Sequence, residues 1–149
     1  MTYSIQAIIA VQGSFPAALP DGAIVLPLGS GLQMIPIGRA MRERYAIPFL
    51  PLTDDGGAVL PATLRALCAR LGARGPVAYI EAELFGGSGT QAHVLVPAPG
   101  ADTMLRVSDD AINRALGWLG VTPLGGKDEF ATVGLGRHRE TDAWLDETR

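Results

Sequence analysis

Two glutamates separated by a single residue stand in the stretch VAYIEAELF, residues 77–85. Apolar and polar residues alternate through this stretch, which is typical of a β-strand because successive side chains point to opposite faces. Glu81 and Glu83 would therefore share one face with Tyr79, with neighbours about 6–7 Å apart. Such a face could perform acid–base chemistry, or it could be a solvated surface on which polar residues pair across strands.

The glycine-rich segment GGSGT, residues 86–90, determines where the chain goes next. A phosphate-binding glycine loop leads directly into a helix, and its P-loop form contains a lysine followed by serine or threonine. This segment has no lysine and leads into AHVLVPAP, which is apolar, partly β-branched and ended by prolines. The sequence therefore predicts a β-hairpin in which residues 77–85 pair antiparallel with residues 92–96.

A hairpin brings further polar residues near the two glutamates. If Gln91 and His93 continue on the face of Glu81, a carboxylate pair, an amide and an imidazole meet there. Glu81, Glu83 and His93 would then be the acid–base groups of an enzyme that acts on a small molecule. Alternatively, these four residues and Tyr79 form a surface that binds a partner.

A second polar cluster, GRHRETD, spans residues 136–142. Arg137 and Arg139 flank His138, and arginines of this kind bind phosphate groups or the carboxylates of a partner protein. Their charges could instead pair locally with the acidic residues that follow them. Trp144 lies directly downstream, and we expect it to dock this cluster on the rest of the protein.

Metal-binding patterns are weak in this sequence. Asp54 and Asp55, with Asp21, could offer oxygen ligands to a hard cation, but DDGG is also ordinary turn chemistry and no EF-hand spacing is present. Cys68 is the only cysteine, and the two histidines are too few for a multi-histidine site. We expect neither a metal nor a cofactor.

The elements that position these residues come in adjacent pairs of strands, with helices between the pairs. Two apolar runs, residues 23–28 and 32–37, flank a Gly-Ser-Gly connection and predict a second hairpin, which its prolines place at an edge of the sheet. Further strands are expected at residues 3–11 and 130–135. This order predicts an α+β fold with a mainly antiparallel sheet and two or three packed helices, in a single globular domain spanning residues 1–149.

Two helices are expected from apolar residues repeating at helical spacing. Pro61 opens the first helix and Gly72 ends it, while Ser108 is expected to be the N-cap of the second and Gly120 its end. We expect the following residues of these helices and of the strand at 77–85 to be buried together: Leu64, Leu67, Cys68, Leu71, Ile80, Leu84, Ile112, Leu116 and Leu119.

The composition narrows the classes of function. The net charge is −3 with no block of like charge, so general nucleic-acid binding is not supported. No apolar run approaches the roughly 20 residues needed to span a bilayer, and the N-terminus lacks a signal-peptide pattern. We therefore expect a cytoplasmic protein that does not act at a membrane.

The sequence contains no nucleophile elbow, kinase signature, zincin helix, Walker loop or deaminase motif. This favours a non-enzymatic module that binds another protein, and the acidic composition is compatible with a small bacterial inhibitor of the immunity or antitoxin type. A third interpretation is an assembly subunit that exposes a sheet edge and multimerises, against which the prolines of the second hairpin argue. The partner-binding residues expected from the two polar clusters are Tyr79, Glu81, Glu83, Gln91, His93, Arg137, His138 and Arg139.

Overall fold

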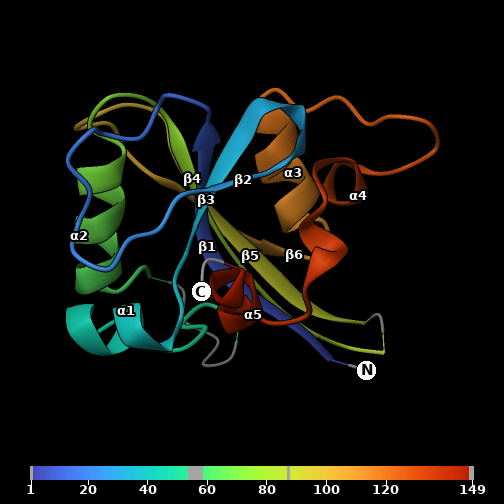
Figure 1. The fold of residues 1–149 in the computed structure, drawn as a ribbon, viewed down its shortest axis with the longest axis horizontal. Helices are drawn as coiled ribbons and strands as arrows, with labels where there is room; N and C mark the ends of the chain where they lie inside the picture. Colours follow the sequence, from blue (N-terminus) through green and yellow to red (C-terminus); the bar gives the residue numbers. More distant parts are fainter. Residues whose placement is uncertain (1, 54–58, 87, 148–149) are drawn as a thin grey trace.

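A computed structural model describes residues 2–53, 59–86 and 88–147 of the chain. It contains a six-stranded antiparallel sheet with helices on both faces (Figure 1), which confirms the predicted α+β class. The strand order is β2-β3-β1-β4-β5-β6, so β1 and β4 are central and β2 and β6 are the edges. The strands are β1 (Thr2–Val11), β2 (Leu26–Pro27), β3 (Leu32–Pro36), β4 (Val77–Phe85), β5 (Ser88–Val96) and β6 (Met104–Ser108).

Helices cover the sheet on two sides (Figure 1), which we call the α2 face and the α3 face. The α2 face carries α1 (Arg39–Tyr45) and α2 (Ala62–Leu71), and the α3 face carries α3 (Ala111–Trp118), α4 (Glu129–Val133) and α5 (Thr141–Asp146). Two short 3-10 turns are η1 (Gly29–Gly31) and η2 (Leu135–Arg137). Among the described residues, none of the helices has the length and apolar character needed to cross a membrane.

The central strands are buried on both faces, which produces two cores instead of one. In β1, Ile5 and Ile9 pack toward the α3 face while Ile8 packs toward the α2 face. The expectation that all nine core residues lie together is therefore wrong, because the sheet separates them. Leu64, Leu67, Cys68 and Leu71 are buried on the α2 face; Ile80, Ile112, Leu116 and Leu119 are buried on the α3 face, where Leu84 is partly buried.

Two expectations about the second half of the chain are also wrong. No strand forms at residues 130–135, which instead lie in helix α4, its C-cap Gly134 and the start of η2; the Asp128 side chain caps α4 by accepting the backbone N–H of Ala131 at 2.8 Å. Ser108 is not the N-cap of α3; it ends β6, and its hydroxyl donates to Asp110, which occupies the N-cap position. Strand β6 is an element that sequence periodicity did not indicate.

The C-terminal segment docks beside the first half of β1, where β3 does not pair with it. The backbone N–H groups of Ser4 and Gln6 donate to the carbonyl of Arg139 at 2.8 Å and to the hydroxyl of Thr141 at 3.0 Å. Trp144 is buried in the core of the α3 face, which confirms the expectation that it anchors this segment.

Candidate functional site

The glycine-rich segment is part of a hairpin, as predicted. Strands β4 and β5 pair antiparallel down to Phe85 and Ser88, so β5 begins inside GGSGT. Gly89 has a φ of 154°, and a Cβ at this position would lie 2.1 Å from the carbonyl oxygen of Glu83. No side chain fits at that distance, so the glycine permits the close approach of the two strands. The segment continues as a strand and does not open a helix that could hold a phosphate.

Glu81 is fully buried on the α2 face, where it holds the loop between α1 and α2. One carboxylate oxygen accepts the backbone N–H of Leu52 at 3.1 Å and the hydroxyl of Tyr79 at 3.0 Å. The other oxygen accepts the N–H of Thr53 at 2.9 Å and its hydroxyl at 2.7 Å. Burial raises the pKa of Glu81, and the hydrogen bonds from Thr53, Leu52 and Tyr79 oppose that rise.

The loop that Glu81 holds contains a strained residue. Leu50 has a φ of 44° and is buried, a backbone conformation that L-residues with large side chains rarely adopt. Strain of this kind persists where neighbouring contacts fix the backbone, and the hydrogen bonds that the N–H groups of Leu52 and Thr53 donate to Glu81 do so two and three residues further along the chain. Glu81 is therefore a structural carboxylate, and the exposed acidic face expected around it is not formed.

His93 and Gln91 lie on the opposite face of the sheet from Glu81. The register pairs Glu81 with Ala92, so the neighbours of Ala92 in β5 point toward the α3 face. There Nδ1 of His93 lies 2.7 Å from the carbonyl oxygen of Ala111, and Gln91 Oε1 accepts the backbone N–H of Ile112 at 3.1 Å. Both side chains thus attach the start of α3 to β5.

This geometry corrects the acid–base hypothesis. The register pairs Glu81 with Ala92 and Phe85 with Ser88, so every odd-numbered residue of β4 opposes an even-numbered residue of β5. Glu81 and Glu83 therefore cannot share a face with His93, and the three residues do not converge on one substrate. Burial lowers the pKa of His93, with the nearby Arg106 and Arg114 charges acting in the same direction, and the bond to Ala111 opposes this.

The Arg137–Arg139 cluster is ordered and largely occupied by internal contacts. Oε1 of Glu147 lies 2.7 Å from Nη2 of Arg137 and 2.6 Å from Nε2 of His138. The His138 ring packs edge-on against Trp144, with centroids 4.9 Å apart. Local pairing of these charges is therefore what the structure shows.

The remaining candidates from the sequence contribute little. Asp54 and Asp55 lie outside the described residues, and within the described ranges no group of three metal-ligating side chains is found. Burial raises the pKa of the Cys68 thiol to about 12, in keeping with a small core residue.

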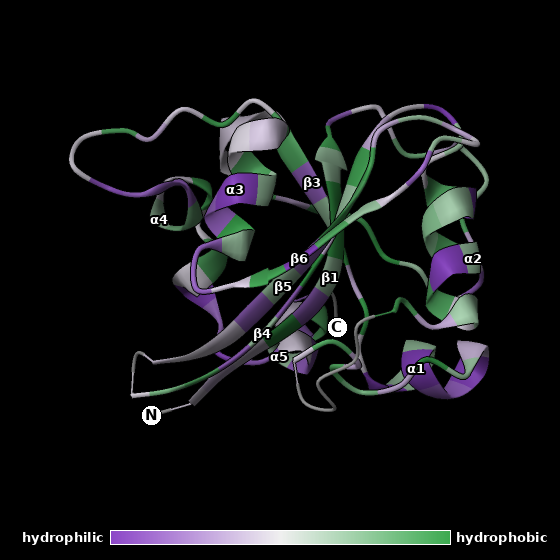
Figure 2. Cartoon of the chain, turned by 180° about the vertical axis from the view of Figure 1, so that it is seen from behind, coloured by the Kyte–Doolittle hydropathy of each residue, from purple (hydrophilic) through white to green (hydrophobic). Residues whose placement is uncertain are grey.

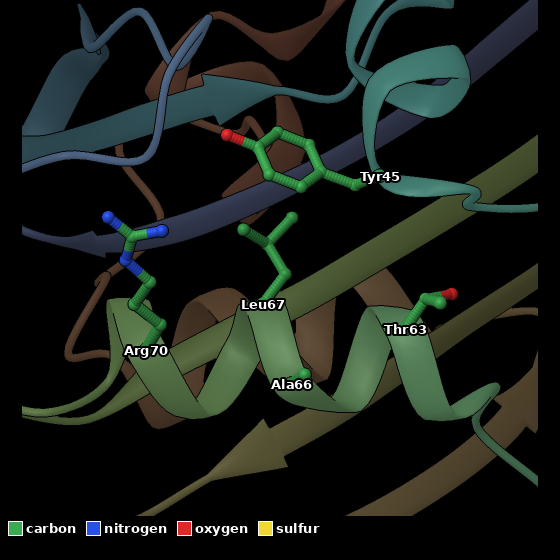
Figure 3. A pocket seen from close by; sticks show the side chains of 5 residues that line it. All are labelled: Tyr45, Thr63, Ala66, Leu67 and Arg70. Carbon is green, nitrogen blue, oxygen red and sulfur yellow. The ribbon is translucent and has the colours of Figure 1, made fainter.

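A shallow cleft of about 240 Å³ separates the end of α1 from α2 (Figure 3). Tyr45 faces Leu67 across it, with Arg70 toward one end and Thr63 toward the other. The hydroxyl groups of Tyr45 and Thr63 already donate to the carbonyls of Asp21 and Ala46. The cleft therefore offers few free polar groups to a ligand.

Edge strand β6 is where large apolar side chains are exposed together. The exposed fractions are 46% for Met104, 36% for Leu105 and 46% for Val107. Trp118 of α3, which shares a cleft with Met104, is also 36% exposed. Figure 2 shows β6 between α3 on one side and α2 on the other, with no helix across the strand.

Within the described ranges, the outer edge of β6 also presents backbone groups that have no hydrogen-bond partner. In antiparallel sheets each residue directs its N–H and C=O toward one neighbouring strand, and consecutive residues alternate. Gln6 donates its N–H away from β4. The even-numbered residues of β1 therefore face away from β4, and its odd-numbered residues bond to the even-numbered residues of β4. The odd-numbered residues of β4 then bond to β5, and the remaining, odd-numbered residues of β5 bond to β6. His93 is one of these, so its partner Arg106 belongs to the ladder with β5. The N–H and C=O groups of Leu105 and Val107 therefore point outward.

A cleft accompanies β6 on each face of the sheet. On the α2 face, a largely apolar cleft of about 430 Å³ lies between the second half of α2, Val96 and the loop 98–103 that leads into β6. On the α3 face, a cleft of about 330 Å³ is lined by residues that include Met104, Arg106, Arg114 and Trp118. The free edge thus combines backbone donors and acceptors, apolar side chains and two cations.

Comparisons with protein-family models, curated proteins and solved structures each found no match to this chain.

Proposed function

We propose that this protein is a protein-binding module that receives an extended segment of another protein as an additional strand beside β6. The observation that carries the proposal is the free edge itself, where unpaired backbone groups of Leu105 and Val107 coincide with exposed apolar side chains. Edge-strand addition uses these two features, because backbone bonds supply affinity and pockets for alternate side chains supply specificity.

The two edges of the sheet differ in a way that supports β6 as the binding edge. Strand β2 is two residues long and contains Pro27, which has no N–H to donate. Strand β6 is five residues long, contains no proline and leaves three large apolar side chains exposed. Proteins usually shorten or block an edge strand because it can pair with other chains. Here one edge is blocked in this way and the other is open.

Capture of an extended segment suits an inhibitor of the immunity or antitoxin type, which acts by occupying part of its target. The acidic net charge of −3 is the other feature that supports this class. A cytoplasmic location belongs to the same proposal.

The test uses a peptide that is selected for binding to the wild-type protein from a random displayed library. The affinity of this peptide is then measured for two variants at Val107. Val107→Pro removes an outward N–H and leaves the ladder to β5 intact, whereas Val107→Ala shortens the side chain and keeps the N–H. We expect both variants to remain folded, with Val107→Pro losing peptide binding and Val107→Ala retaining most of it. Amide hydrogen exchange should show protection of Leu105 and Val107 when peptide is bound.

Two results would contradict the proposal. One is a Val107→Pro variant that binds the selected peptide as tightly as the wild type. The other is a bound peptide that protects amides elsewhere while those of Leu105 and Val107 still exchange rapidly.

A further inference from the structure

We infer that the segment received beside β6 carries a carboxylate side chain, flanked on each side by an apolar residue, and that Arg106 and Arg114 hold this carboxylate. The inference rests on the proposed strand addition and specifies the chemistry of the partner. It comes from the side chains that the two faces of β6 present to an incoming strand.

The α3 face presents two guanidinium groups held by one network. Arg106 Nε donates to the Ser108 hydroxyl at 3.3 Å, that hydroxyl donates to Asp110 at 2.7 Å, and Arg114 Nε donates to the same carboxylate at 2.7 Å. Each arginine therefore uses its Nε internally. Among the described residues, no hydrogen bond or ion pair occupies the terminal nitrogens of either guanidinium.

The charge balance in this cleft favours an anion. Asp110 neutralises one of the two guanidiniums, which leaves an excess of one positive charge beside the edge of β6. Hydrogen bonding from Ser108 and Arg114 lowers the pKa of Asp110, so its carboxylate remains ionised. A carboxylate on the incoming strand opposite Arg106 would accept from the free terminal nitrogens, the geometry in which guanidinium groups bind carboxylates well.

The α2 face presents apolar side chains in the same row. Leu105 and Val107 point to this face, because their partners Val94 and Ala92 lie in the α2-face core. Thr103 begins the row and lines the apolar cleft. An incoming strand places its residues on alternate faces, so the neighbours of the carboxylate residue would pack against Leu105 and Val107.

A second copy of this chain fits the edge poorly. A twofold axis that pairs the whole of β6 with its copy passes through Arg106, the middle residue of the strand. This pairing sets Arg106 opposite Arg106 of the copy, and like charges directly opposite each other are destabilising. We therefore take the partner to be a different chain, with an acidic residue where this pairing of two copies would place an arginine.

The experiment titrates labelled protein with three capped synthetic peptides, TTVEVTT, TTVQVTT and TTVKVTT, and follows backbone amide shifts by NMR. The valines flank the central residue, so glutamate, its uncharged isostere and a cation are compared in one frame. We expect TTVEVTT to shift the amides of Leu105 and Val107 and to bind about 3- to 10-fold more tightly than TTVQVTT, with TTVKVTT weakest. In Arg106→Gln the first two peptides should bind equally. Arg70→Gln removes an equal charge from a different cleft and should keep the preference.

The outcomes separate this inference from the proposed function. Equal binding of TTVEVTT and TTVQVTT to the wild type, with shifts at Leu105 and Val107, would support strand addition and refute the carboxylate. A preference that survives in Arg106→Gln would also refute it. If no peptide shifts these two amides, strand addition fails and the inference fails with it.

Discussion

Replacing Glu81 with alanine should destabilise the protein strongly, because four donors converge on this one carboxylate. The N–H of Leu52 and the hydroxyl of Tyr79 are buried and would be left without an acceptor. Each such group costs about 1–3 kcal/mol, so the expected loss in the free energy of unfolding is about 2–6 kcal/mol. The two donors of Thr53 add less, since this residue is only half-buried. Glu81→Gln keeps the shape but turns an amide group toward donors, and should cost about half as much.

Urea denaturation followed by circular dichroism measures this loss, and Glu83→Ala is the matched control. Glu83 is two residues away on the same strand and the same face, is half-buried, and has no hydrogen bond from its side chain within the described residues. Its replacement should change stability by no more than about 0.5 kcal/mol. If Glu81→Ala and Glu83→Ala unfold at the same urea concentration, the structural role of Glu81 is wrong.

Two further predictions concern the core and the dependence of stability on pH. Leu67→Ala should cost about 2–3 kcal/mol in urea denaturation, at the low end for buried leucines because Leu67 lines an open cleft, whereas the exposed Arg70→Ala control should change little. The lowered pKa of His93 means that the unfolded chain takes up this proton first, so its contribution to stability is complete above about pH 7 and is lost as pH falls through about 6.5. Urea midpoints at pH 7.5 and pH 5.5 should therefore differ less in His93→Gln than in the wild type; an unchanged difference would contradict the assignment.

Local patterns in the sequence were sufficient for the elements whose signals are local. The stripe of α2, bounded by Pro61 and Gly72, and the hairpin at GGSGT follow from periodicity and turn chemistry, and both are confirmed. The prediction of a single core was wrong because alternation along a strand does not say whether helices will cover one face of the sheet or both. Strand β6 was missed because Met104–Ser108 is short and its exposed side chains give no clear alternation of apolar and polar residues.

The candidate site was harder to predict, because it depends on which strands are neighbours. Glu81 reads as a reactive group, yet the loop carrying Leu52 and Thr53 closes over it from more than 25 positions away in the chain. Gln91 and His93 were assigned to the wrong face by one residue of register, which is enough to move every side chain of a strand across the sheet. Any connection with an even number of residues pairs odd-numbered residues of one strand with even-numbered residues of the other, and this parity rule could have been applied to the sequence.

Polar sequence motifs are usually interpreted as functional sites, but in this structure the polar candidates have structural roles. Glu81 and His93 have the most reactive side chains, but both are buried. Glu81 is hydrogen-bonded to a loop, and His93 is hydrogen-bonded to the start of α3. Leu105 and Val107 have unreactive side chains, yet these remain exposed beside backbone groups that have no partner among the described residues. Burying such side chains is favourable by about 25 cal/mol for each Å² removed from water, and among the described residues no helix or strand leaves these two side chains buried. A strand supplied by another protein would bury that surface and pair those backbone groups in one step, which is why β6, and not the polar hairpin, is the site to test first.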